Sequence, residues 1–278
     1  MKIITAVVNN VDFIEIQYHT LKKYFKGEYE FIVFNDAKKF VDYTNDGDLT
    51  IQKKICDLCT SLHIQCIDIP NQHHIHNTSA ARRCSDSMNF ILKYQLKHPD
   101  KYLLLDSDMF LIDFFDIEKY ANYDCAIVLQ SRNSIHYFWN GIYYFDMNKI
   151  KNKHMLNWNP CLHCDVGGMM QNWLSQQVQS IPNVDELRWT NKTFHTENTY
   201  FIKHLWSCTW NNNELPNNLK QNHELITFLA NDPRNINNYF CEIYDNVFLH
   251  YRAGGNWNKE GMSFHKQLTQ KLKNIILQ

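Results

Sequence analysis

The chain has 278 residues, of which 44% are hydrophobic and 21% are charged, and its formal net charge is −1 at pH 7. This length can bury the core of one large domain. The absence of a basic surplus argues against a nucleic-acid partner, and no apolar stretch approaches the roughly 18 residues that a membrane-spanning helix needs.

The nine cysteines have irregular spacing, which favours reduced thiols over a disulfide framework. The sequence runs from Met1 directly into an apolar stretch without a signal-peptide pattern. We therefore expect a soluble cytoplasmic protein without a leader or a transmembrane segment.

The first third of the chain alternates between strand and helix patterns. Residues 2–8, 29–34 and 64–69 are rich in β-branched and aromatic side chains and predict strands, whereas residues 11–24 and 50–62 have helical spacing. A β-α-β-α-β order implies a parallel sheet with a nucleotide site at the carboxyl ends of its strands. Polar residues lie near those ends, and they either read a base and a ribose or simply terminate the strands: Thr5, Asn9, Asn35 and Asp36.

A longer helix is predicted from about residue 80 to residue 97, after a capping segment at residues 77–79. Arg82, Arg83 and Asn89 lie on its first turns, so that one face can offer an arginine to a diphosphate and an amide to a sugar. Adjacent residues on a helix do not share a face. We therefore expect one arginine to be functional and the other to be solvated.

Two aspartates end the apolar run at residues 102–105, in the segment Asp106-Ser107-Asp108. The run is typical of a strand that is buried on both faces. Side chains two positions apart on an extended backbone point to the same side, so both carboxylates can face one object. Hard oxygen ligands of this kind suit Mg²⁺ or Mn²⁺.

The middle of the chain contains an aromatic-amide-glycine segment, Trp139-Asn140-Gly141, between predicted strands at residues 125–129 and 142–145. A glycine allows close backbone approach, and an aromatic ring can stack on a sugar. The alternative interpretation is an ordinary turn.

Two carboxylates in the second half are candidates for acid–base chemistry. Asp165 lies beside Gly167 and Gly168, which predict a tight turn or a helix entry. Glu197 belongs to residues 196–198, which we expect to open a helix, and there it is either a reacting group or a carboxylate that the helix dipole stabilises.

The C-terminal part contains a predicted strand that ends at His250, followed by Arg252, a glycine turn with Gly255, and Trp257. A final amphipathic helix is predicted from about residue 264 to residue 277.

A competing zinc site would use Cys56-x-x-Cys59 together with Cys161-x-x-Cys164. No fixed spacing links the two pairs. The histidines at residues 73–76 lie in a polar loop and are expected to be solvated.

Taken together, these motifs resemble glycosyltransferases of the GT-A fold, the nucleotide-diphospho-sugar transferase superfamily. The resemblance lies in residues 5–10, 33–36, 80–92, 103–109, 139–141, 165–168 and 250–257. It implies an α/β fold with a GT-A-like, Rossmann-type mixed and mostly parallel sheet flanked by helices. It also implies a single domain over residues 1–278, with a nucleotide-sugar-binding half at 1–112 and an acceptor-binding half with a C-terminal metal-ligand segment at 113–278.

The resemblance also implies roles for individual residues. Asp108 and His250 would hold Mn²⁺ or Mg²⁺ at the diphosphate of a UDP-sugar, with Asp106 on the metal or the ribose. Asp165 would deprotonate the acceptor hydroxyl of a carbohydrate or glycosylated acceptor, and Glu197 could serve there or support the reacting sugar. Contacts with the nucleotide sugar are expected from Thr5, Asn9, Asn35, Asp36, Arg82, Arg83, Asn89, Asp106, Ser107, Asp108, Trp139, Asn140, Gly141, Gly167, Gly168, Arg252, Gly255 and Trp257.

The segment around Glu197 is similar to the His-Asp-Glu-Ser segment of retaining galactosyl- and N-acetylgalactosaminyltransferases, but Thr196 stands where those enzymes have aspartate. Neither the sugar nor the stereochemistry can therefore be transferred. The sequence shows no N-terminal membrane-anchoring stem, and in this respect it is more similar to the soluble bacterial or viral members of the superfamily.

Two alternatives remain open. One is an aspartate-nucleophile phosphatase, in which Asp106 is phosphorylated and Asp108 acts as acid and base; Met109 and Phe110 depart from the small residues usual there. The other is a catalytically inactive sugar-nucleotide fold that is used for recognition.

Overall fold

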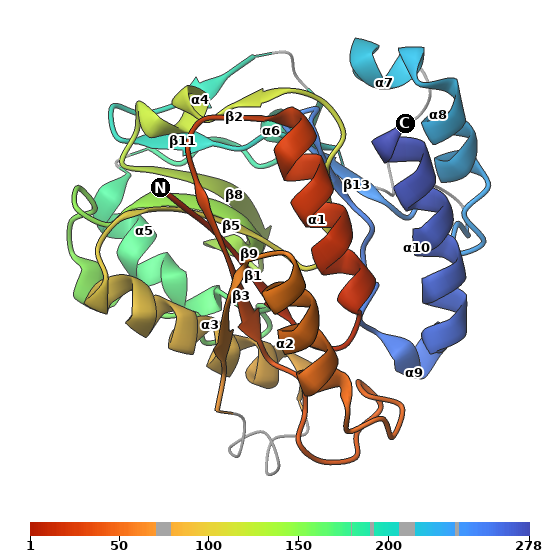
Figure 1. Ribbon diagram of the computed structural model, residues 1–278. Coiled ribbons are helices and arrows are strands. Elements are labelled where there is room, and N and C mark those ends of the chain that lie inside the picture. The colour runs from red at the N-terminus through yellow and green to blue at the C-terminus, as the bar shows by residue number, and fades with distance from the viewer. Residues whose placement is uncertain (71–78, 179, 190–191, 206–214, 237–238) are drawn as a thin grey trace.

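In the part of the chain that the structure describes, the fold consists of a large sheet, a smaller sheet, a two-stranded pair and the helices around them (Figure 1). A computed structural model describes residues 1–278 except 71–78, 179, 190–191, 206–214 and 237–238. The large sheet has the strand order β10-β11-β8-β9-β5-β1-β3-β4, with bounds Phe194–His195, Thr199–Phe201, Cys125–Arg132, Ile135–Asp146, Lys101–Leu105, Lys2–Val7, Glu30–Asn35 and Gln65–Asp68.

The large sheet is mostly parallel. Strands β4, β3, β1 and β5 run parallel to one another. Strand β9 is antiparallel to both of its neighbours, β5 and β8, so that β8 and its neighbour β11 run in the same direction as β5. The predicted α/β class, with a mixed and mostly parallel sheet flanked by helices, is confirmed. The carboxyl ends of β1, β3 and β5 meet at one edge of the sheet, where the Asp106–Asp108 segment begins.

The helices cover both faces of the large sheet (Figure 1). Their bounds are α1 Val11–Tyr24, α2 Ile51–Ser61, α3 Ala80–Lys97, α4 Glu118–Ala121, α5 Gln171–Gln177, α6 Glu186–Trp189, α7 Asn217–Gln221, α8 His223–Ala230, α9 Trp257–Glu260 and α10 Met262–Leu277. Two short 3-10 turns span Lys153–Met155 and Gly168–Met170. Among the described helices, none has the length and apolar character needed to cross a bilayer.

Alternate side chains of each central strand enter opposite hydrophobic layers. Ile3 and Leu103 pack with residues of α1 and α2, whereas Ile4 and Leu104 pack with residues of α3 and α5. Both layers exclude water. Full burial of each side chain of this size stabilises the folded state by roughly 1.5–3 kcal/mol relative to leaving it exposed. This two-sided burial explains why the strands read as continuous apolar runs in the sequence.

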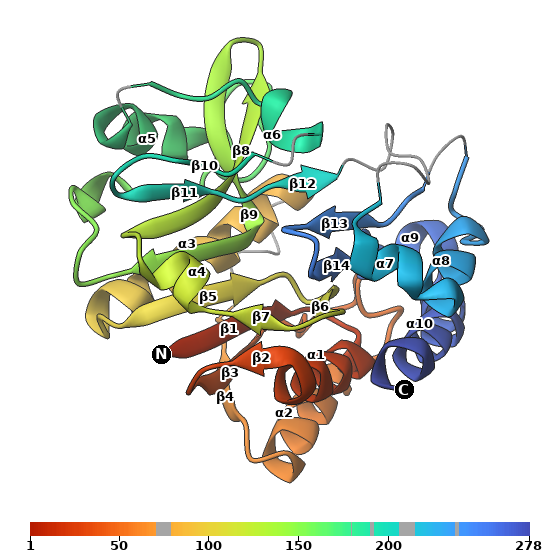
Figure 2. The same ribbon diagram turned by 90° about the horizontal axis from the view of Figure 1, so that it is seen from above.

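A smaller antiparallel sheet lies between the large sheet and the helices α8 and α10 (Figure 2). Its strand order is β12-β13-β14-β6, with bounds His204–Leu205, Glu242–Tyr244, Phe248–His250 and Met109–Leu111. A separate pair joins β2 (Phe25–Lys26) to β7 (Phe115–Asp116). The pairing of β14 with β6 brings the C-terminal part of the chain to the residues that follow Asp108.

Two local predictions are wrong. The sequence places Trp139-Asn140-Gly141 between two strands, with an ordinary turn as the alternative, but the segment lies inside β9, a strand of 12 residues. Residues 196–198 do not open a helix; they form the turn of the hairpin between β10 and β11. The predicted helices at residues 11–24, 50–62 and 80–97 are confirmed, as are the first three predicted strands.

Candidate metal and ligand site

The Asp106-Ser107-Asp108 segment forms a turn between β5 and β6 and not an extended strand. The backbone N–H of Asp106 donates to the carbonyl of Gly141 over 2.6 Å, which fixes the turn to β9. The Asp106 carboxylate accepts from the N–H of Ser107, and Gln17 donates its amide to the Asp106 carbonyl. The turn places both carboxylates close together, as the sequence predicted, although by a different backbone geometry.

His250 joins the two aspartates through strand pairing. In the register of the small sheet, His250 lies opposite Met109, the residue after Asp108. Its Nε2 atom lies 3.2 Å from Oδ1 of Asp108. One potential ligand atom from each of Asp106, Asp108 and His250 lies within 4.8 Å of the other two. This trio is called the acidic triad below.

Backbone N–H groups of the segment after β14 hold Asp108 in place. Its Oδ2 atom accepts from the backbone N–H of Gly254 over 2.8 Å, and its carbonyl accepts from the N–H of Tyr251 over 2.8 Å. Both donors belong to the segment that follows β14. The carboxylate is therefore fixed between β6 and the glycine turn.

A second carboxylate orients the imidazole of His250. Glu242 lies directly opposite His250 in the register of β13 and β14, and its Oε2 atom is 3.0 Å from Nδ1. The same Oε2 atom accepts from the hydroxyl of Tyr244 over 2.8 Å. This arrangement leaves Nε2 facing Asp108, and a carboxylate behind a histidine is the usual support of a metal-ligating imidazole.

Burial and charge act against each other in the acidic triad. Burial and the neighbouring Asp108 raise the pKa of Asp106 to about 7. Burial disfavours the charged forms of Asp108 and His250, but their mutual attraction lowers the pKa of Asp108 and, with Glu242, raises the pKa of His250 to about 10. The carboxylates around His250 therefore favour positive charge at this position.

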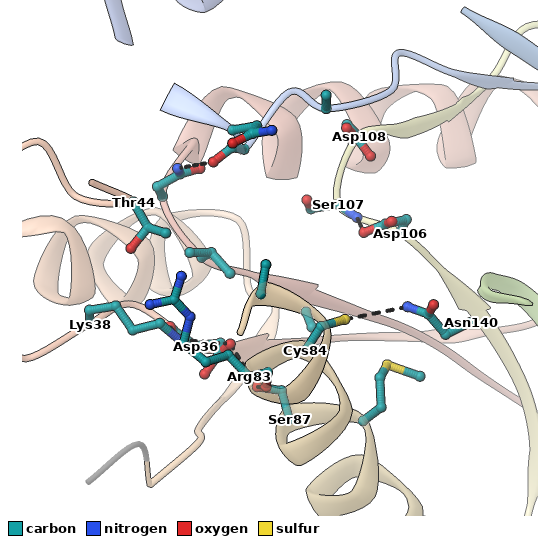
Figure 3. A pocket seen from close by; sticks show the side chains of 18 of the residues that line it. Asp36, Lys38, Thr44, Arg83, Cys84, Ser87, Asp106, Ser107, Asp108 and Asn140 are labelled. Carbon is teal, nitrogen blue, oxygen red and sulfur yellow. Dashed lines mark hydrogen bonds and ion pairs between the residues drawn. The ribbon is translucent and has the colours of Figure 1, made fainter. Parts of the chain in front are cut away.

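A cavity of about 360 Å³ opens beside the acidic triad (Figure 3). It is lined from the ends of β1, β3 and β5, from the start of α3, from β9 and from the turn after β14. Its polar lining residues are Asn9, Asp36, Lys38, Tyr43, Thr44, Arg83, Cys84, Ser87, Asp106, Ser107, Asp108, Asn140, His250 and Asn256. The cavity therefore lies where ligands bind in open α/β sheets.

Asp36 and Lys38 form a buried ion pair in the cavity wall. The Oδ2 atom of Asp36 lies 3.2 Å from Nζ of Lys38 and accepts from the hydroxyl of Ser87 over 2.7 Å. Only 3% of the Lys38 residue is exposed. Lys38 was missed in the sequence, where its only signal is its position two residues after the strand-ending aspartate.

The two adjacent arginines of α3 lie in different environments. Arg83 lines the cavity, donates to Oδ2 of Asp42 over 2.8 Å and donates to the hydroxyl of Tyr43 over 2.9 Å. Arg82 is exposed and does not line the cavity. Two partners therefore hold the guanidinium of Arg83 in place.

Ten of the predicted contact residues do not line the cavity: Thr5, Asn35, Arg82, Asn89, Trp139, Gly141, Gly167, Gly168, Arg252 and Trp257. Thr5 is fully buried within β1. Asn35 donates to the carbonyl of Gln52, and Asn89 accepts from the N–H of Trp158. Asn35 and Asn89 thus hydrogen-bond the protein's own backbone, so a polar residue at a strand end or on the first turns of a helix was an insufficient criterion.

The Trp139-Asn140-Gly141 segment nevertheless contributes to the site from inside β9. Asn140 lines the cavity and donates to the thiol of Cys84 over 3.5 Å. The Trp139 ring stacks on Tyr244, with centroids 5.3 Å apart, and its centroid is 5.0 Å from that of His250. Trp139 therefore packs against the imidazole of the acidic triad, and it is absent from the cavity wall.

The glycine pair at Gly167 and Gly168 has a backbone role. Gly167 has a φ of +90°, and a Cβ there would lie 2.4 Å from the carbonyl of Phe138, so only glycine fits. Neither glycine lines the cavity. Asp165, just before them, is exposed, and its charge helps to raise the pKa of the Cys84 thiol, after burial and the charges of Asp106 and Asp36.

Glu197 lies at the wrong end of the sheet for the predicted role. It is exposed in the hairpin turn, where the carbonyl of Asn198 accepts from the N–H of Asp124, just before β8. Because β8 is parallel to β5, the start of β8 lies at the edge opposite the one that carries Asp106. The predictions of a helix start and of contact with the reacting sugar are therefore not supported for Glu197.

Of the three predicted contact residues in the segment after β14, one lines the cavity and two do not. Gly255 lines the cavity, and its carbonyl accepts from the amide of Asn9 over 2.9 Å. Arg252 lies 3.6 Å from Glu242 and is 44% exposed. Trp257 is 5% exposed and packs in the core beside α1, outside the cavity wall.

Comparisons with known proteins give limited information. No protein-family model matches the chain, and the search of curated proteins found no match. Among solved structures, an active-site mutant of LgtC matches with a TM-score of 0.38 and 14% sequence identity. The match covers 54% of this chain and 58% of the LgtC chain, so it spans little more than half of either protein.

Proposed function

We propose that the protein transfers a sugar from a nucleotide-diphosphate sugar to an acceptor hydroxyl, with a divalent cation held by the acidic triad. The observation that carries this proposal is the position of the triad at the wall of a polar cavity of about 360 Å³, at the carboxyl ends of β1, β3 and β5. We propose UDP as the nucleotide and Mn²⁺ or Mg²⁺ as the cation.

The residues of the acidic triad fit such a cation. Two carboxylates and one imidazole are ligands that Mn²⁺ accepts, and three protein ligands leave positions for phosphate oxygens. Glu242 supports His250 as an outer-shell carboxylate, and Gly254 holds Asp108. A bound divalent cation would neutralise the charge that develops on a diphosphate leaving group.

The cavity wall offers complementary groups for the rest of the donor. Asn9 and Asp36 lie at the ends of β1 and β3, where an amide and a carboxylate can hydrogen-bond a base or a ribose. Lys38 and Arg83 add positive charge to the same wall. Because Asp36 and Asp42 already pair with these cations, their geometry is fixed before a ligand arrives.

Asp165 is our candidate for the base that deprotonates the acceptor. It is exposed and does not itself line the cavity, but Gly167, two residues further on, lies against the carbonyl of Phe138 in β9, the strand that brings Asn140 to the cavity wall. An acceptor that enters from solvent can reach an exposed carboxylate. A positioned base of this kind contributes on the order of 10²–10⁴-fold to a proton-transfer step.

The test is UDP-sugar turnover in the presence of Mn²⁺, measured as release of UDP by the wild type, by Asp108→Asn and by Asp113→Asn as the control. Asp113 is a partly exposed carboxylate five positions further along the chain. We expect turnover in the wild type and the control and its loss in Asp108→Asn. Metal-dependent hydrolysis of a generic phosphate ester without UDP release would instead favour the phosphatase, and tight binding without any turnover would favour a recognition protein.

A further inference from the structure

Three cysteines and an aspartate cluster on the outer edge of the large sheet, away from the acidic triad. Cys56 and Cys59 belong to α2, and Cys66 and Asp68 belong to β4, the last strand of the sheet. The Sγ atoms of Cys56 and Cys66 are 3.6 Å apart, and Sγ of Cys56 is 3.8 Å from Oδ1 of Asp68. One donor atom from each of Cys56, Cys66 and Asp68 lies within 4.8 Å of the others.

We propose that Cys56, Cys66 and Asp68 bind a zinc-class divalent cation. In a tetrahedral site with Zn–S bonds of about 2.3 Å, two sulfur ligands are separated by roughly 3.8 Å. The two cysteine sulfurs already lie at nearly this separation. The cluster therefore needs little rearrangement to surround a tetrahedral ion.

The hydrogen bonding around Cys56 favours a sulfur that accepts. The Asn35 amide is oriented by the N–H of Ala37, which donates to its oxygen, so its nitrogen faces the other way. That nitrogen donates to Sγ of Cys56 over 3.3 Å and to the carbonyl of Gln52 over 3.0 Å. The Asn35 donor favours the thiolate, which is the form that binds a metal, whereas burial and the neighbouring Cys66 raise the pKa of Cys56 to about 11. A bound metal would therefore have to displace the proton of this thiol.

The cluster is open to the ion on one side and supported on the other. Asp68 is exposed and Cys56 and Cys66 are partly exposed, which gives an entry path. Cys59 is fully buried, and its interaction with Cys66 raises the pKa of the Cys66 thiol. Cys59 is not among the mutually close donors, so we assign it the positioning of Cys66 and not direct ligation.

The site differs in chemistry from the acidic triad and from the zinc site that the sequence suggested. Thiolates select zinc-class ions, whereas carboxylate-rich sites suit Mn²⁺ and Mg²⁺. Among the described residues, the mutually close donors around Cys56 do not include Cys161 or Cys164. The ion would join α2 to the edge strand, next to Asn35 and the cavity residue Asp36.

The test is titration of the reduced full-length protein with Co²⁺, a spectroscopic substitute for Zn²⁺. A thiolate-to-cobalt charge-transfer absorption reports only on cysteine ligands, so occupancy of the acidic triad does not contribute to it. We expect one equivalent of Co²⁺ to produce this absorption in the wild type and in Asp108→Asn. Excess Zn²⁺ should abolish it, and Mn²⁺ should not.

Variants identify the ligands. Cys66→Ser should lose the absorption, and Cys161→Ser, the matched control from the other Cys-x-x-Cys pair, should keep it. Asp68→Asn changes an exposed side chain and should weaken Co²⁺ binding by at least about tenfold, since charged metal ligands and their partners contribute on this scale. Absence of the absorption in the wild type, its persistence in Cys66→Ser, or its loss in Cys161→Ser would each overturn the proposal.

Discussion

The Nε2 atom of His250 lies 3.2 Å from Oδ1 of Asp108, and Nδ1 of the same ring lies 3.0 Å from Oε2 of Glu242. The imidazole is thus held between one carboxylate of the acidic triad and one carboxylate outside it. Glu242 orients the ring. Asp108 lies on the Nε2 side of the ring, where we propose that the cation binds.

Changing Glu242 to Gln should weaken Mn²⁺ binding without removing a ligand. Loss of an outer-shell partner typically lowers metal affinity by about 10–100-fold, because the ring is less well oriented and less basic. Electron paramagnetic resonance of free Mn²⁺ in a titration measures this affinity. Glu118→Gln, at an exposed carboxylate of α4, is the control. Equal affinities in Glu242→Gln and the control would remove Glu242 from the account.

Changing Arg83 to Ala should weaken donor binding, whereas Arg82→Ala should not. Hydrogen bonds to charged groups contribute about 1.5–3 kcal/mol, which corresponds to roughly a 10–100-fold loss of affinity for a nucleoside diphosphate. The two residues are adjacent in the chain, but only Arg83 lines the cavity. Isothermal titration with UDP in Mn²⁺ buffer compares them directly. A larger effect in Arg82→Ala would contradict the placement of the donor diphosphate.

Asp165→Asn and Glu197→Gln separate the two carboxylates that the sequence offered for catalysis. We expect Asp165→Asn to lower turnover on the order of 10²-fold with donor affinity retained, because the base acts only in the reacting complex. Glu197→Gln should leave turnover unchanged, since Glu197 lies at the opposite edge of the sheet. Steady-state turnover of both variants decides the matter, and normal turnover in Asp165→Asn would refute its assignment as the base.

Gly254→Ala should destabilise the protein, and Gly255→Ala should not. A Cβ at Gly254 would lie 2.4 Å from the Phe13 ring and 2.8 Å from that of Tyr251, whereas one at Gly255 would meet nothing nearer than 3.5 Å. Overpacking of this kind typically costs about 1–3 kcal/mol. Urea unfolding of both variants measures the difference. Equal free energies of unfolding for the two variants would contradict the close packing of Gly254 against Phe13 and Tyr251.

Much of the fold followed from local patterns in the sequence. The apolar runs of β1, β3 and β5 and the helical spacing of α1 identified these elements, because burial on both faces or on one face leaves a periodic trace. Asp108 and His250 were linked through the resemblance to metal-dependent GT-A glycosyltransferases, with both residues placed at the ends of predicted apolar strands. Their contact itself depends on the pairing of β14 with β6, which no local pattern encodes.

The failures have related physical causes. Trp139-Asn140-Gly141 resembled a turn because glycine and asparagine are common there, yet the sheet on both sides of β9 imposes a strand. Residues 196–198 form a short polar segment, which occurs both at helix starts and in hairpin turns, and the local sequence does not distinguish the two. Glu242 and Lys38 were missed because their roles arise from a cross-strand neighbour and from burial in a cavity wall.

The most direct test of the central claim is calorimetric titration of UDP into the protein with Mn²⁺ and with a chelator. We predict binding that requires Mn²⁺ in the wild type, that is lost in both Asp108→Asn and His250→Ala, and that is tighter for UDP than for GDP. Thermal unfolding of each variant in the absence of metal verifies that the fold is intact. UDP binding that is equally strong in the chelator, or that both variants retain, would contradict a cation-dependent nucleotide site at the acidic triad.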